Sequence, residues 1–240
     1  GSLAAVRAHY ATIMADTTSI PGTEGVLRAL AVADRSAIPA PVWARFRDTG
    51  TAHLLAISGL HISLVASLGV LLGVMVWRVR IHLPGPPARR DAILPIAGLA
   101  AAAYAPLAPV SLPTTRALIM LLVPLGAFAT RRRVSPSQGL ALACLGVLVI
   151  DPFAPLDAGL WLSFGAVGLI LAAVARRPMG TTALGDWLRI QALLSVGLLP
   201  ITLAIFGHVP LASFPANLVS IPWVTLTVVP PTLFGLLLHP

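Results

Sequence analysis

The residues that could do chemistry in this chain lie in a strongly apolar stretch, residues 53–66, which reads HLLAISGLHISLVA. His53, Ser58 and His61 interrupt it. A polar side chain inside an apolar, membrane-length segment costs free energy unless it has a partner or meets water, so these residues are functional candidates by default. Ser58 and His61 are three positions apart and share one face of a helix. Gly59 beside them leaves room for a neighbouring helix or a ligand.

Several interpretations of this set stay open. The three side chains could be hydrogen-bonded packing residues between helices, or they could line a water-filled path. Ser58 as nucleophile with His61 as base would make an intramembrane serine hydrolase, but the stretch offers no obvious oxyanion site. A metal site would lack a carboxylate from the same run. We therefore expect no catalytic residue and no metal here, and no cofactor, because no phosphate-cradling glycine loop occurs in the chain.

Further polar residues interrupt apolar segments later in the chain. Arg116, in SLPTTRALIM, follows an uncharged loop by a few residues. It could extend to the outer headgroups, or it could place a fixed positive charge at the outer mouth of a pore, where an anion would meet it. Gln191 and Asn217 are either hydrogen-bond partners between helices or path-lining groups, and Ser163 belongs to a small-residue packing seam with Gly165.

Composition indicates the solvent in which these residues must work. The chain has 240 residues, of which 57% are hydrophobic and 10% are charged, with a mean hydropathy of +0.91. Soluble domains carry about 25% charged residues, so a water-soluble domain is excluded and a polytopic, all-α membrane protein is predicted. The lone cysteine, Cys144, rules out an intrachain disulfide and a cysteine metal cluster.

The hydropathy pattern divides the chain into two parts. Residues 1–50 are the least apolar, and we expect short interfacial helices at Leu3–Ala15 and Glu24–Asp34. Residues 51–240 form the transmembrane part, with about seven spanning segments. A spanning helix needs about 20 residues, so 136–150 is short, and prolines around Asn217 predict that the last segment is a broken helix. The predicted spans are 52–77, 92–109, 114–130, 136–150, 158–175, 187–207 and 213–238.

Arginine alternates from loop to loop between these segments. The loops at 78–91, 131–135 and 176–186 contain arginine, whereas the loops around 106–113 and 151–157 contain none. The positive-inside rule then places the basic loops in the cytoplasm and the N-terminal segment outside. The second of these basic loops begins with three consecutive arginines, Arg131, Arg132 and Arg133.

The segment HLLAISGLHIS resembles the competence domain of the ComEC family, the inner-membrane DNA-uptake channel proteins of naturally transformable bacteria. The likeness extends upstream through ALAVADRSAIP and FRDTG, and downstream through LPTTRALIM, the block from SPSQGLALACLG to GLWLSFGAVGLI, and LLPITLAIFGHVPLASFPANLVSIPWVTL. The family commonly has Gly-Phe-Gln-Leu-Ser-Phe where this chain has GLWLSF at 159–164. Family members also often carry an outer nucleic-acid-binding domain and a metallo-hydrolase domain, but this chain contains no His-x-His-x-Asp-His set.

The resemblance implies a membrane channel, not an enzyme, that imports single-stranded DNA across the bacterial inner membrane during natural transformation. Its implied partners are single-stranded DNA, the lipid bilayer, other competence machinery, and the outer DNA-binding and nuclease domains of the full-length protein. Arg116 would then meet DNA phosphate, and Arg131, Arg132 and Arg133 would receive the strand at the cytoplasmic exit. The DNA path would be lined by residues chosen from His53, Ser58, Gly59, His61, Ser163, Gln191 and Asn217. A carrier or channel for small anions, which would share this topology, is the alternative.

Overall fold

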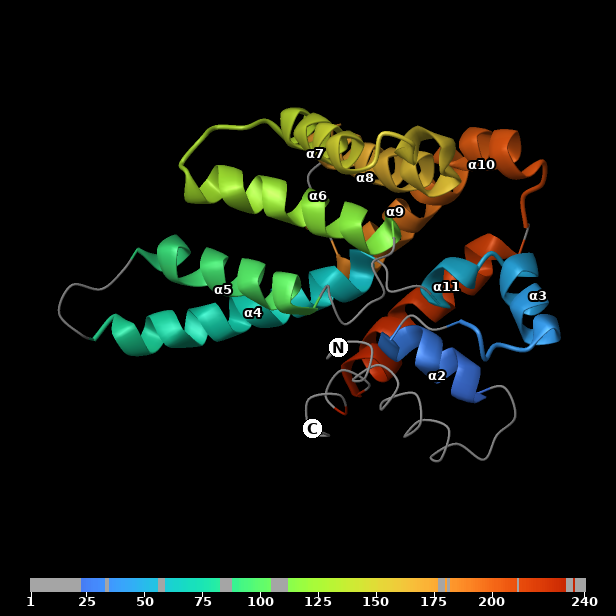
Figure 1. The fold of residues 1–240 in the computed structure, drawn as a ribbon, viewed down its shortest axis with the longest axis horizontal. Helices are drawn as coiled ribbons and strands as arrows, with labels where there is room; N and C mark the ends of the chain where they lie inside the picture. The colour runs from blue at the N-terminus through green and yellow to red at the C-terminus, as the bar shows by residue number, and fades with distance from the viewer. Residues whose placement is uncertain are drawn as a thin grey trace.

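The computed structural model describes residues 23–32, 35–55, 59–82, 88–104, 112–176, 180, 182–210, 212–231 and 235. Within these ranges every regular element is helical and no strand occurs, which confirms the all-α prediction (Figure 1). In chain order the elements are α2 (Thr23–Val32), α3 (Ala40–Asp48), η1 (Ala52–Leu55), α4 (Gly59–Arg80), α5 (Arg89–Tyr104), α6 (Leu112–Ala129), α7 (Pro136–Ile150), η3 (Ala154–Leu156), α8 (Ala158–Arg176), α9 (Ala183–Gly197), α10 (Leu199–Phe206), α11 (Ser213–Trp223) and η4 (Val224–Val228).

Helices α4 and α5 form a close antiparallel hairpin (Figure 1). A Cβ atom added to Gly69 would lie 2.8 Å from the Cα of Ala97, and one added to Gly73 would lie 2.8 Å from the Cα of Ile93. Glycines four residues apart share a helix face, and this spacing lets two backbones approach closely in a membrane. The pattern GVLLG at 69–73 was the sequence signal for this contact, although the predicted small-residue contact was at Ser58 and Gly59.

The α6–α7–α8 layer is joined by one apolar cluster. Val147 of α7, Ala154 of η3 and Leu160 of α8 are buried together, with Ile119 of α6 and Phe164 packed against them. Because η3 is a single short turn, it brings the end of α7 and the start of α8 close to the first turns of α6. This arrangement positions the candidate site described below.

A second apolar cluster joins the α4–α5 hairpin to the C-terminal helix. Ile62 of α4, Tyr104 of α5 and Val229 are buried together, with Leu118 of α6 and Val224 of η4 packed against them. The cluster therefore connects segments that are more than 160 positions apart in the sequence.

The predicted break in the last segment does not occur within residues 213–231, and residues 232–234 and 236–238 of that segment lie outside the described residues. Backbone from Ser213 to Pro231 is helical throughout, and Val224–Val228 form a π turn instead of a gap between two half-helices. The sharp bend lies one segment earlier, where α9 and α10 meet at 41°. Pro200 in the first turn of α10 has no N–H to bond back into α9, which explains a new helix start at this point.

The N-terminal helices partly match the prediction. Helix α2 occupies the expected 24–34 segment, whereas the expected Leu3–Ala15 helix lies outside the described residues. Helix α3 was not predicted, because its prolines suggested a loop; they lie at the helix start, which tolerates proline. The chain then turns at Gly50 with φ of 67°, where a Cβ would lie 2.6 Å from that of Ser213. This contact holds the N-terminal segment against the start of α11.

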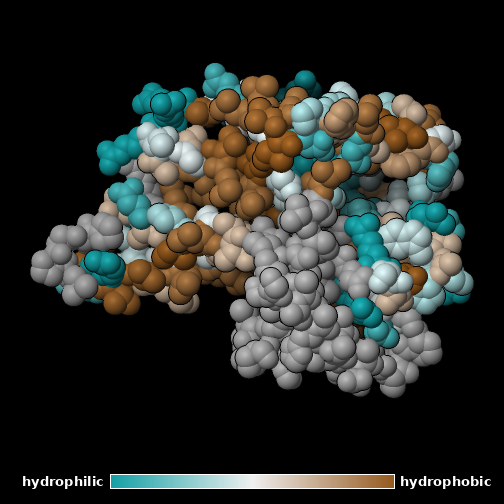
Figure 2. Space-filling view, in the orientation of Figure 1, coloured by the Kyte–Doolittle hydropathy of each residue, from teal (hydrophilic) through white to brown (hydrophobic). Residues whose placement is uncertain are grey.

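Three of the described helices, α4, α6 and α8, are long and apolar enough to cross a membrane. In α4 the membrane-length part is Ile62–Arg80. The bent α9–α10 pair makes a fourth if it is one span, while α5 and α7 are apolar but shorter. The predicted count of about seven spans is thus not confirmed. Apolar residues form much of the surface of the helices on the face shown in Figure 2. Exposed large apolar side chains include Leu71 and Met75 on α4, and Leu99 on α5. A surface of this kind suits lipid and not water.

The turn after α6 contains a residue in the left-handed region. Arg131 is exposed and has φ of 58°, with its N–H bonded to the carbonyl of Phe128. An L-residue is disfavoured there and glycine is not. We expect Arg131→Gly to raise the free energy of unfolding by about 0.5–1 kcal/mol, measured by thermal melting in detergent. The neighbouring Arg132→Gly is the control, which relieves no left-handed strain and should not stabilise.

Candidate functional site

The candidate site is built on a buried ion pair between Arg116 and Asp157. Arg116 lies in the second turn of α6 and is only 4% exposed. Its Nη1 donates to the carboxylate Oδ2 of Asp157, the residue that precedes α8. The Nε atom of Arg116 is buried with no hydrogen-bond partner among the described groups. The arginine is therefore neither extended to the headgroups nor a free charge; its charge is compensated within the protein.

The first turn of α8 is shaped to receive this arginine. A Cβ atom on Gly159 would clash with the Arg116 guanidinium and lie 3.0 Å from Oδ2 of Asp157, so a larger residue here would push the arginine out of its present position. The backbone N–H of Gly159 donates to Oδ1 of Asp157 at 3.1 Å. Partial burial acts to raise the pKa of Asp157, but the bonds from Arg116 and Gly159 outweigh it, and the pKa lies below its ordinary value. Asp157 thus stays ionised as the partner of Arg116.

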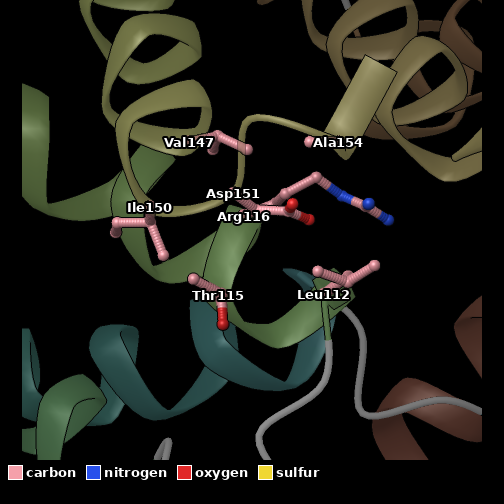
Figure 3. Close-up of a pocket in the computed structure, with 7 residues that line it drawn as sticks. All are labelled: Leu112, Thr115, Arg116, Val147, Ile150, Asp151 and Ala154. Carbon is pink, nitrogen blue, oxygen red and sulfur yellow. The ribbon is translucent and has the colours of Figure 1, made fainter. Parts of the chain in front are cut away.

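A cavity of about 230 Å³ lies beside the ion pair (Figure 3). The starts of α6 and η3 and the end of α7 surround it, and Figure 3 shows the Arg116 side chain extended between Leu112 and Ala154. Asp151 contributes a second carboxylate, one oxygen of which accepts from the N–H of Phe153 at 3.0 Å. The residues that line the cavity are Leu112, Thr115, Arg116, Val147, Ile150, Asp151 and Ala154.

The predicted His53–Ser58–His61 set is only partly visible. His53 is in η1, exposed, with Nδ1 3.0 Å from the carbonyl oxygen of Gly50. Ser58 lies outside the described residues. Gly59 and His61 are in the first turn of α4, but the side chain of His61 is not among the described parts of the structure. Path-lining and packing roles for this set both stay predictions.

The remaining predicted residues have different surroundings. Ser163 donates to the carbonyl of Gly159 at 2.6 Å, so its hydroxyl is satisfied within α8. Gln191 of α9 is buried, at 4% exposure. The Oδ1 atom of Asn217 in α11 is buried without a partner among the described groups. Arg131, Arg132 and Arg133 are exposed in the turn after α6. Within the described residues, none of these side chains lines the cavity beside Arg116.

Asp157 and Asp151 were not predicted as site residues. Both lie in the arginine-free loop at 151–157, which is predicted to be on the same membrane side as the start of the Arg116 segment. Opposite charges on one side of a membrane protein are a usable pairing signal, because an intramembrane arginine needs a partner. A metal interpretation gains no support, since no three His, Cys, Asp or Glu side chains in the described ranges are grouped to hold an ion.

Comparison with known proteins identifies the family to which the chain belongs. Residues 30–240 match the family model described as Competence protein. The chain is 39% identical over 217 residues to Competence protein ComA of Neisseria gonorrhoeae, covering 88% of this chain and 30% of that protein. It is 34% identical over 224 residues to Recombination protein 2 of Haemophilus influenzae, covering 88% and 28%. It is 27% identical over 218 residues to ComE operon protein 3 of Bacillus subtilis, covering 91% and 27%.

The chain thus spans about three tenths of the length of the curated relatives it matches. No solved structure matches it. The family match includes every residue of the Arg116–Asp157 site and of its cavity. The chain belongs to the competence protein family, as a competence domain of the ComEC type.

Proposed function

We propose that this chain acts in DNA uptake as the membrane channel through which single-stranded DNA crosses the bacterial inner membrane during natural transformation. The observation that carries the proposal is the family match over residues 30–240, with relatives named for competence and recombination. The apolar, membrane-length helices α4, α6 and α8 support a location in the membrane. We assign no catalytic role to the chain.

The polar groups of the described helices suit a conduit that binds its cargo weakly. Non-specific sites for single-stranded DNA combine cationic grooves with aromatic platforms, whereas the positive charge within α6 belongs to Arg116, which is already paired. A channel must release what it admits, and a strongly basic bore would retain a polyanion. The side chains of Gln191 and Asn217 are uncharged, and Gln191 and the Oδ1 atom of Asn217 are buried, so they add no positive charge that would retain a strand.

Transformation with labelled duplex DNA tests the function. A strain that lacks the gene encoding this chain should still bind DNA at its surface but should not accumulate internalised, nuclease-protected label, and the restored gene should recover it. Normal internalisation in the deletion strain would refute the proposal. The small-anion carrier predicts a different outcome, an anion flux that persists when no DNA is present.

The orientation of the chain is tested by labelling from the two sides of the membrane. The end of α4 and the turn after α6, which contain Arg80 and Arg132, both lie toward the left of Figure 1, as the arginine alternation requires. In a Cys144→Ala background, we expect Asp48→Cys to react with an impermeant thiol reagent from outside, and Arg132→Cys only after permeabilisation. Both positions are exposed. Labelling of both from one side would contradict the predicted topology.

A further inference from the structure

The cavity beside Arg116 combines apolar walls with a hydrogen-bond donor and an acceptor. Arg116 supplies donors, Asp151 supplies a carboxylate and Thr115 supplies a hydroxyl. A volume of about 230 Å³ corresponds to roughly seven or eight water molecules, which is the size class of one flat heterocycle and not of a nucleotide. The apolar walls are formed by Leu112, Val147, Ile150 and Ala154.

Arg116 lines this cavity and offers it hydrogen-bond donors. A guanidinium carries five N–H donors, of which one on Nη1 is donated to Asp157. The Nε atom is fully buried and is not the donor in question. An acceptor on a ligand in the cavity could bond the remaining N–H groups, so the site favours a ligand with an acceptor edge.

The charges around the cavity select against ions. Arg116 and Asp151 line the cavity with opposite charges, and Arg116 is also paired with Asp157, which is not part of the lining. With one guanidinium and two carboxylates, the local charge is negative and a phosphate group would be repelled. A metal cation would be repelled by the guanidinium of Arg116, which lines the cavity. The ligand that fits is uncharged, has apolar faces, and carries an acceptor and a donor along its edge.

We propose that this cavity binds a single unstacked nucleobase of a DNA strand, an inference that rests on the proposed function. Arginine donates to base acceptors, and aspartate accepts from the exocyclic amine of cytosine. Arg116 and Asp151 provide this pair, and the aliphatic walls contact the faces of the ring. The contact with DNA at this site is thus to the base, and the carboxylates keep the backbone phosphates outside.

Strands with and without bases test the proposal. The protein in lipid nanodiscs is titrated with a fluorescent oligodeoxycytidine and with an abasic strand of the same length and the same number of phosphates. We expect the abasic strand to bind about tenfold more weakly, since a good pair of hydrogen bonds to a base edge is worth about 1–3 kcal/mol. Equal affinity for the two strands would overturn the base site and leave the channel function standing. Failure of both strands to bind would also overturn the base site, whereas the channel function is decided separately by uptake of labelled DNA in the deletion strain.

Variants locate the base contact. Asp151→Ala should bring the affinity for oligodeoxycytidine down to that for the abasic strand, while Asp48→Ala, at an exposed acid at the end of α3, should leave the tenfold difference unchanged. Ala154→Leu, which fills the cavity from η3, should have the same effect as Asp151→Ala, so the result does not depend on one variant's folding. A difference that persists in both variants would place the base contact elsewhere and overturn the proposal.

Discussion

Gly73→Ala is expected to destabilise the protein, whereas Gly126→Ala is expected to stabilise it, although both replace a helical glycine by the same residue. At Gly73 the new Cβ would lie 2.8 Å from the Cα of Ile93, so α4 and α5 must move apart. At Gly126, in α6, no neighbouring atom lies within 4 Å of the Cβ position. Overpacking costs about 1–3 kcal/mol, and relief of glycine in an open helix gains about 1 kcal/mol.

Thermal melting of the two variants in one detergent measures this difference, with the amount of monodisperse protein as a second reading. Gly69→Ala, which meets the Cα of Ala97, should resemble Gly73→Ala. Equal and unchanged melting temperatures for the Gly73 and Gly126 variants would show that the α4–α5 hairpin does not depend on close backbone contact.

Arg116→Ala should reduce DNA uptake more strongly than Arg116→Lys, provided that both variants reach the membrane. Alanine removes the charge that balances Asp157, whereas lysine keeps a cation able to reach it without the planar, multi-donor geometry of arginine. Removing one member of a fully buried pair costs about 3–5 kcal/mol, and the cost here is lower because the Asp157 side chain is 35% exposed. The measurement is internalised label per cell, normalised to the protein in the membrane.

Arg132→Ala is the matched control, because it removes an exposed arginine from the turn after α6. A double variant separates the ion pair from any direct contact with the strand. If the pair only supports folding, Arg116→Ala combined with Asp157→Ala should recover stability and uptake together, because no buried charge remains unpaired. If Arg116 also contacts DNA, stability should recover while uptake stays low. Normal uptake in both single Arg116 variants would remove the residue from the DNA path.

Of the two residues in the buried ion pair, the sequence pointed to Arg116 but not to its partner Asp157. The position of Arg116 two residues into an apolar segment, after an uncharged loop, was enough to single it out, because a charge in that environment is expensive wherever the helix lies. Its partner was not apparent, since Asp157 is 41 positions away and becomes a neighbour only when α7 and η3 fold back onto α6. The cavity with Asp151 depends on the same fold-back.

The bend in the C-terminal half shows a similar limit. Proline marks positions where a helix loses a backbone hydrogen bond, and the sequence has prolines both at Pro200 and in the last segment. Whether the chain bends there depends on what packs against it: Val224 and Val229 are held against the core cluster, and the helix continues through a π turn. At Leu198–Pro200 the chain bends by 41° instead.

The sequence by itself determined the helical class, the membrane as the medium and the family of this protein, because hydropathy, helix periodicity and motif order are properties of the chain read along its length. Only the tertiary structure decided that Arg116 pairs with Asp157, that Gly159 makes room for it, and that a cavity with Asp151 opens beside them. These are contacts between distant segments, and they depend on helix packing that no local pattern encodes.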